Sequence, residues 1–142
     1  MDKYYMNLAI KMAKFAYTRN EVPVGAIVVN CDNDMVTKGY NQKNSSKLIT
    51  KHAEIIAIER MCKEIGDWRL SNCVLYVTLE PCLMCIGAII ESRIKKVVIG
   101  CNNSHNQDLI GILRKNNIEV VENVLSNDCS MILKDFFKAK RK

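Results

Sequence analysis

The chain has 142 residues, of which 49 % are hydrophobic and 25 % charged, a composition typical of globular proteins that excludes a disordered chain. No apolar run approaches the roughly 20 residues of a membrane-spanning helix, so we expect no membrane segment and no signal peptide. The length suits one domain over residues 1–142. The formal net charge of +6 favours an anionic partner such as nucleic acid.

Basic charge is concentrated at the C-terminus, where residues 134–142 carry +4 of the net charge of +6. Two interpretations stay open. The cations stabilise the C-terminal end of a helix, or they contact the phosphates of a nucleic acid. We expect Phe136 and Phe137 to anchor this helix to the core, with the basic side chains facing outward.

Seven cysteines are an odd number, and no export signal accompanies them, so we expect a reducing cytoplasm rather than a disulfide framework. Only Cys82 and Cys85 have the spacing of metal or redox ligands. The remaining five are expected to be small buried hydrophobic side chains, namely Cys31, Cys62, Cys73, Cys101 and Cys129.

Hydrophobic periodicity predicts alternating helices and strands. In chain order we expect a helix over 3–19, a hairpin of strands 24–29 and 35–40 with its turn at 31–34, a loop over 41–51, a helix over 53–63, a strand over 74–79, a helix that opens with Pro81 and runs to about residue 92, a strand over 96–100, a helix over 108–115, a strand over 118–121, and a last helix from an N-cap at Ser126 or Asn127 through Phe137. This order predicts an α/β fold with a mixed sheet and helices on its faces, whose functional sites gather at the carboxyl ends of strands.

Two short motifs carry chemistry: HAE at residues 52–54 and PCLMC at residues 81–85. Cysteines three residues apart at a helix start can place both sulfurs on one metal ion, and the helix N-terminus favours the thiolate form. His52 would supply a third ligand. Three protein ligands leave the fourth tetrahedral position to water, which is the catalytic arrangement of zinc, and zinc makes hydroxide available near neutral pH.

Glu54 follows His52 by two residues and can face the open position without binding the metal. We expect it to carry a proton from the water to a leaving nitrogen. A histidine and glutamate in H-x-E together with P-C-x-x-C is the known pattern of the zinc nucleobase deaminases. Two weaker interpretations of the cysteine pair are a redox pair and a closed structural zinc site with Cys73 or Cys101 as its fourth ligand.

With these residues the chain resembles the cytidine-deaminase-like superfamily and, within it, the bacterial tRNA-specific adenosine deaminases. Matching stretches spread over nearly the whole chain: EVPVGA at 21–26, Asn41, KHAEI at 51–55, LYVTLEPCLMCIGAI at 75–89 and SRI at 92–94. The two metal motifs specify only the superfamily. The longer run through residues 78–88 resembles the tRNA branch.

The resemblance implies a three-layer cytidine-deaminase-like fold, a mixed five-stranded sheet flanked by helices. It implies one zinc ion per chain on His52, Cys82 and Cys85, with Glu54 as the catalytic acid and base. It further implies a homodimer that hydrolytically deaminates the wobble adenosine of a tRNA anticodon stem-loop to inosine.

The resemblance also implies that Asn41, Ala53 and Asn103 contact the substrate, although Asn41 can equally be an ordinary turn residue. The segment CNNSHNQ at 101–107 departs from the family, because bacterial members have an aspartate, a lysine and glycine-rich residues there. Asn103 takes the place of the aspartate that meets the nucleotide. His105, in the same segment, faces either substrate phosphates or solvent.

Two other functions use the same features. A zinc deaminase of a free base or nucleoside, of the guanine or cytosine type, would have the same metal site, but the basic C-terminus weighs against it. A catalytically silent RNA-binding partner would have no use for Glu54.

Overall fold

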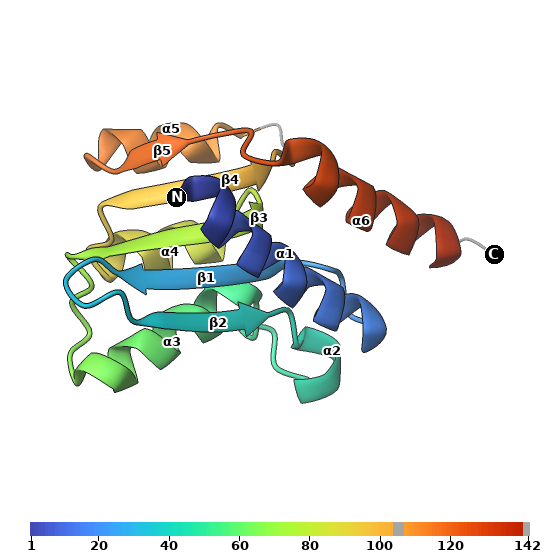
Figure 1. Cartoon of the computed structure of the whole chain (residues 1–142), viewed down its shortest axis with the longest axis horizontal. Helices are drawn as coiled ribbons and strands as arrows, with labels where there is room; N and C mark the ends of the chain where they lie inside the picture. The colour runs from blue at the N-terminus through green and yellow to red at the C-terminus, as the bar shows by residue number, and fades with distance from the viewer. Residues whose placement is uncertain (104–106, 141–142) are drawn as a thin grey trace.

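The computed structural model describes residues 1–103 and 107–140 (Figure 1). Its elements are α1 (Asp2–Thr18), β1 (Gly25–Asn30), β2 (Val36–Tyr40), α2 (Lys43–Ser46), α3 (Ala53–Ile65), β3 (Cys73–Leu79), α4 (Leu83–Glu91), β4 (Lys96–Cys101), α5 (Leu109–Lys115), β5 (Glu119–Val121) and α6 (Ser126–Lys140). Every expected helix and strand is present, and α2 is an addition within the expected loop. Among the described residues, no helix combines the length and apolar character that crossing a membrane requires.

The strands form one mixed sheet in the order β2-β1-β3-β4-β5. Strand β1 runs antiparallel to both β2 and β3, whereas β3, β4 and β5 are parallel. The predicted mixed five-stranded sheet is therefore confirmed. Because Leu79 pairs with Cys101, strands β3 and β4 end at the same edge, and the segments that follow them lie side by side.

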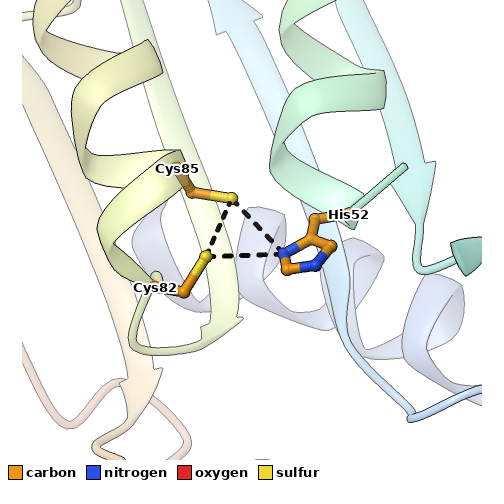
Figure 2. A group of neighbouring side chains, drawn as sticks. All are labelled: His52, Cys82 and Cys85. Carbon is orange, nitrogen blue, oxygen red and sulfur yellow. Dashed lines mark hydrogen bonds between the residues drawn. The ribbon is translucent and has the colours of Figure 1, made fainter. Parts of the chain in front are cut away.

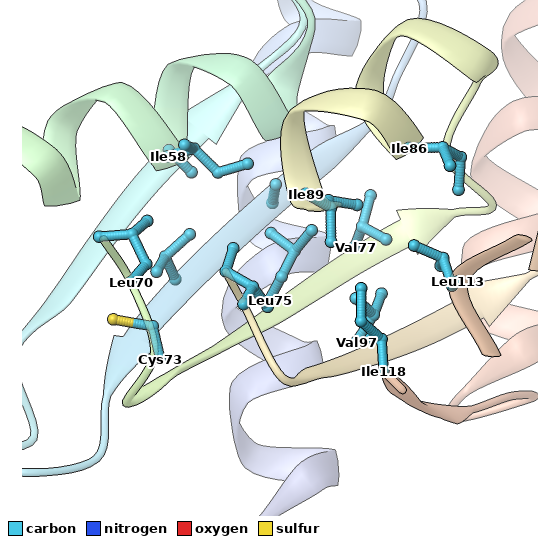
Figure 3. Close-up of a cluster of buried hydrophobic side chains, with 14 of the residues drawn as sticks. Ile58, Leu70, Cys73, Leu75, Val77, Ile86, Ile89, Val97, Leu113 and Ile118 are labelled. Carbon is cyan, nitrogen blue, oxygen red and sulfur yellow. The ribbon is translucent and has the colours of Figure 1, made fainter. Parts of the chain in front are cut away.

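Helices cover both faces of the sheet, which gives the predicted three layers. Helices α1 and α6 lie on one face, and α3, α4 and α5 lie on the other (Figure 1). Buried side chains such as Ile58 of α3 and Ile89 of α4 pack against Leu75 of β3 (Figure 3). Burial of a side chain of this size stabilises the fold by about 1.5–3 kcal/mol, so α3 and α4 are firmly anchored.

A glycine lets the third helix lie directly on an edge strand. A Cβ atom added to Gly39 of β2 would collide with the backbone of Ala53 and come within 2.9 Å of the backbone nitrogen of Ala57, both in α3. Only glycine permits this approach, since any other side chain would push α3 away from the sheet. The first turn of α3, which carries the HAE motif, is thereby fixed against β2.

Two helix starts differ from expectation. Helix α4 begins at Leu83 with Cys82 as its N-cap, because the carbonyl of Cys82 accepts the first helical hydrogen bond, from the N–H of Ile86 at 2.9 Å. Pro81 therefore precedes the helix instead of opening it. In α6 the carbonyl of Leu125 has that role, accepting from Cys129 at 3.1 Å, so neither predicted N-cap is right.

Two further expectations are corrected by burial. Phe136 is buried, but Phe137 is 45 % exposed, because neighbouring residues on a helix point in different directions and only one of the two faces the core. Of the five cysteines expected in the core, Cys31 is exposed because it lies in the turn after β1, and Cys62 is half-buried. The other three are buried, and all seven cysteines are free thiols.

Candidate active site

Both metal motifs sit at helix starts. His52 is the N-cap of α3 and Cys82 is the N-cap of α4, each with extended backbone geometry and neither with a side chain that caps its own helix. Their side chains are therefore free to turn toward each other. Cys85 lies in the first turn of α4. Figure 2 shows its sulfur beside the sulfur of Cys82 and the imidazole ring of His52.

The three side chains have the spacing that zinc requires. The two sulfurs are 3.8 Å apart, and Nδ1 of His52 lies 3.5 Å from Sγ of Cys82 and 3.7 Å from Sγ of Cys85. Tetrahedral bonds of about 2.3 Å to sulfur and 2.0–2.1 Å to nitrogen place two sulfurs about 3.8 Å apart and a sulfur and a nitrogen about 3.6 Å apart. The three residues could therefore bind a zinc ion without moving from their positions in the structure.

The set of ligands is open. Within the described part of the chain, His52, Cys82 and Cys85 are the one group of potential metal ligands, and neither Cys73 nor Cys101 belongs to it. Within the described residues, the predicted fourth ligands of a closed structural zinc site, Cys73 and Cys101, are therefore excluded. A third ligand in contact with both sulfurs also favours a metal centre over a redox pair.

The two thiols differ in their readiness to ionise. The pKa of Cys82 falls to about 5, chiefly because it shares a hydrogen bond with Cys85, and because backbone N–H groups of Cys85 and Met84 and the nearby His52 favour the thiolate. The same shared bond, together with burial, raises the pKa of Cys85. The pair thus holds a charge at one sulfur, as expected for a site that accepts a cation.

Glu54 lies beside this group on the first turn of α3 and is only 4 % exposed. Burial raises its pKa to about 7, and the nearby Cys82 adds to the rise, while its backbone hydrogen bond and His52 oppose it. A carboxyl group that titrates near neutral pH can both accept and donate a proton there.

The group opens into a cavity of about 280 Å³ between the ends of several elements. Asn41, Ala53 and Asn103 all line it, together with His52, Glu54 and Cys82, so the structure brings these sequence-predicted residues together. His105 lies outside the described residues. A larger hollow of about 590 Å³ lies along α6, away from the metal ligands.

The amide of Asn41 spans two backbone segments. Its Oδ1 accepts from the N–H of Lys43 at 3.2 Å, and its Nδ2 donates to the carbonyl of Val22 at 3.4 Å. The N–H of Asn103 donates to Oε1 of Glu80 at 3.4 Å, which ties the segment after β4 to the end of β3. Asn41 is therefore a turn residue and a cavity residue at once.

Sequence reasoning missed part of the cavity wall. Lys43 and Asn44 of α2 line it, as do Val22, Val24 and Leu79. Within EVPVGA the sequence predicts a strand from residue 24, but Glu21 enters only through the resemblance, and no pattern around it predicts that its carboxyl group is buried.

Comparisons with known proteins agree with this geometry. Residues 1–101 match the family described as cytidine and deoxycytidylate deaminase zinc-binding region. The tRNA-specific adenosine deaminase of Buchnera aphidicola subsp. Schizaphis graminum is 41 % identical over 146 residues, which cover 99 % of this chain and 96 % of the relative.

Two solved structures share the fold. One, from a study of A-to-I editing by tRNA:A34 deaminases at the wobble position of transfer RNA, has a TM-score of 0.83 at 30 % identity and covers 92 % of this chain and 99 % of its own. The guanine deaminase of Nitrosomonas europaea has a TM-score of 0.85 over 94 % of this chain and 83 % of its own, at 20 % identity. The chain therefore belongs to the cytidine and deoxycytidylate deaminase family and, within it, to the tRNA-specific adenosine deaminases.

Proposed function

We propose that this chain deaminates the wobble adenosine of a tRNA anticodon to inosine, with water as co-substrate and ammonia as the second product. The observation that carries the proposal is the open His52, Cys82 and Cys85 group, which shares one cavity with the buried carboxyl of Glu54. Zinc bound there lowers the pKa of a water molecule into the neutral range.

Glu54 is the catalytic residue of this proposal. Its carboxylate takes one proton from the attacking water and delivers it to the purine ring nitrogen next to the reacting carbon. It then moves the second proton, from the hydroxyl group now on that carbon, to the amino group, which leaves as ammonia while the C=O bond forms. Burial raises the pKa of Glu54 from the ordinary value of a carboxyl group, which favours a group that can return the proton it accepts. Its burial keeps bulk solvent away from the transfer.

The cavity accepts one base, which must leave its stack to enter. A single-stranded anticodon loop meets this need at low cost. Asn41 and Asn103 offer amide groups to the base or its ribose, and Ala53 lines the cavity together with His52 and Glu54. These three contacts are the substrate-binding residues of the proposal.

The hollow along α6 favours an RNA strand over a free base. It is lined by Lys134, Lys138 and Phe137, and also by Asn102, whose neighbour Asn103 lines the reaction cavity. The exposed ring of Phe137 offers a stacking surface, and the two ammonium groups offer phosphate contacts. A free base carries no phosphate and reaches no further than the reaction cavity.

We also propose that the whole chain acts as a single deaminase domain in the cytoplasm, as a homodimer. Helix α4 supports the dimer, since Leu83 is 59 % exposed and Met84, Ala88 and Ile90 are only half-buried. A second copy over this apolar helix would cover them. The free thiols and the tRNA substrate suit the cytoplasm. Sedimentation should give twice the monomer mass, and a monomer at micromolar concentration contradicts the dimer.

The test of function is a substrate panel. Zinc-loaded protein is incubated separately with an anticodon stem-loop bearing a wobble adenosine, with the same stem-loop bearing guanosine, and with free guanine, cytosine, cytidine and adenosine. We expect inosine in the adenosine stem-loop and no ammonia from the free compounds. Release of ammonia from guanine or cytosine, with the stem-loop unchanged, would establish the free-base alternative.

A further inference from the structure

We infer that Glu21 is a positioning residue that sets substrate affinity by holding α2 as a wall of the reaction cavity. The inference rests on the proposed function for its substrate, but the contacts that carry it belong to the fold. Glu21 is 1 % exposed, and its carboxylate has no part in the proton transfer assigned to Glu54. A buried carboxylate with no chemical task needs another reason to be there.

The backbone of Glu21 is mounted on a rigid element. Its N–H donates to the carbonyl of Ala16 at 3.0 Å, in the last turn of α1. Four residues later the backbone N–H of Gly25, at the start of β1, donates to the buried hydroxyl of Thr78 at 3.1 Å. The carboxylate therefore projects from a segment that is fixed at both ends.

Both carboxylate oxygens of Glu21 accept hydrogen bonds from the backbone of α2. Oε1 accepts from the N–H of Asn44 at 3.0 Å, and Oε2 accepts from the N–H of Ser45 at 2.6 Å. Hydrogen bonds to a charged acceptor are the stronger kind, contributing more than bonds between neutral groups. Glu21 thus ties the first turn of α2 to a position 23 residues earlier in the chain.

Helix α2 has little else to hold it. None of its four residues is buried, and its N-cap Gln42 makes no side-chain capping bond. Among the described residues, Asn41 is the one other side chain that accepts from its first turn, through the N–H of Lys43. The backbone N–H of Gln42 also donates to the carbonyl of Lys51 at 2.9 Å. Since no residue of α2 is buried, these polar contacts decide where it sits.

The position of α2 matters because Lys43 and Asn44 line the same cavity as His52, Glu54 and Cys82. The metal ligands and Glu54 stand on α3 and α4, which the hydrophobic core holds independently. Loss of the Glu21 contacts should therefore misplace the substrate wall and leave the chemical groups in place. The kinetic signature is a higher KM with an almost unchanged kcat.

The experiment uses Glu21→Gln, which keeps the size of the side chain but presents an amide N–H₂ to one of the two N–H donors. We expect KM for the wobble-adenosine stem-loop to rise about tenfold, with kcat within about twofold of wild type and one zinc per chain. Hydrogen exchange at the amides of Asn44 and Ser45 should accelerate. The matched control Glu64→Gln, an exposed glutamate on α3, should change none of these values.

A double-mutant comparison separates positioning from a merely structural role. In a Lys43→Ala/Asn44→Ala background the wall side chains are gone, so Glu21→Gln should raise KM by much less than tenfold. An equal rise in that background, an unchanged KM in the single variant, or a fall in kcat alone would each overturn the inference.

Two safeguards keep the test decisive. If Glu21→Gln fails to fold, Ser45→Pro removes one donor from an exposed position and should raise KM in the same way. If wild-type protein makes no inosine in the stem-loop, the proposed function fails. The exchange rates of the Asn44 and Ser45 amides then still decide whether Glu21 holds α2.

Discussion

The two sides of the reaction cavity are held by different forces. On the metal side, α3 and α4 carry His52, Glu54 and the two cysteines, and both helices bury apolar side chains in the core. On the substrate side, no residue of α2 is buried, and hydrogen bonds to Glu21, Asn41 and the backbone of Lys51 hold it in place. The chemical groups are thus fixed by hydrophobic burial, whereas the recognition wall is fixed by a few polar contacts that can change without loss of the fold.

The largest effect is expected from Cys85→Ala. Removing one of three ligands should release the zinc, abolish inosine formation and lower the melting temperature, because metal binding energy also stabilises the folded chain. The control is Cys73→Ala, which loses a buried cysteine outside the metal group and should keep one zinc per chain. Elemental analysis measures the zinc content of both variants. One zinc per chain in Cys85→Ala would show that Cys85 is not a zinc ligand.

Glu54→Gln should keep the zinc and the fold but lower kcat by about 10²–10⁴-fold, because the amide cannot carry a proton. The matched control is Glu59→Gln, an exposed glutamate on the same helix, which should retain wild-type kcat. Single-turnover rates with the stem-loop measure the difference. If Glu54→Gln kept a tenth of wild-type kcat, proton transfer would have to be assigned to another group.

The anchoring of α3 predicts a third effect, on stability. A methyl group in Gly39→Ala would press against the backbone of Ala53 and should cost about 1–3 kcal/mol of unfolding free energy. Lys38→Ala, at the exposed neighbouring position, should cost less than about 0.5 kcal/mol. Urea denaturation gives both values. Equal stability of the two variants would show that α3 can move off the sheet freely.

The smallest effect is expected on the α6 side. Lys134→Gln/Lys138→Gln removes two charges from the hollow and should weaken stem-loop binding, with the salt slope of the binding constant reduced by about 0.7–0.9 for each lost phosphate contact. Turnover at saturating RNA should be unchanged. The control is Lys63→Gln/Lys115→Gln, which removes the same charge from the last turns of α3 and α5 and should leave the salt slope at the wild-type value. Equal salt slopes for the two double variants would restore the interpretation of the basic C-terminus as a stabilised helix end.

The same contrast explains which features the sequence predicts. The strands and the long helices follow from apolar periodicity, since burial fixes them, and the three zinc ligands follow from motif spacing at helix starts. The short helix α2 has no apolar pattern, because its contacts are polar and come from Glu21, far away in the chain. The role of Leu125 just before α6 is not predicted either, because leucine is a poor N-cap residue and its positive φ of 55° leaves no mark in the apolar pattern.

The most direct measurement of the central claim is inosine formation in the wobble-adenosine stem-loop by zinc-free protein, before and after one equivalent of zinc is added. We predict no inosine without zinc, recovery to the rate of the zinc-loaded enzyme after the addition, and no recovery in Glu54→Gln measured in parallel. Inosine formed at the same rate by zinc-free wild-type protein would contradict the assignment of His52, Cys82 and Cys85 as a catalytic zinc site.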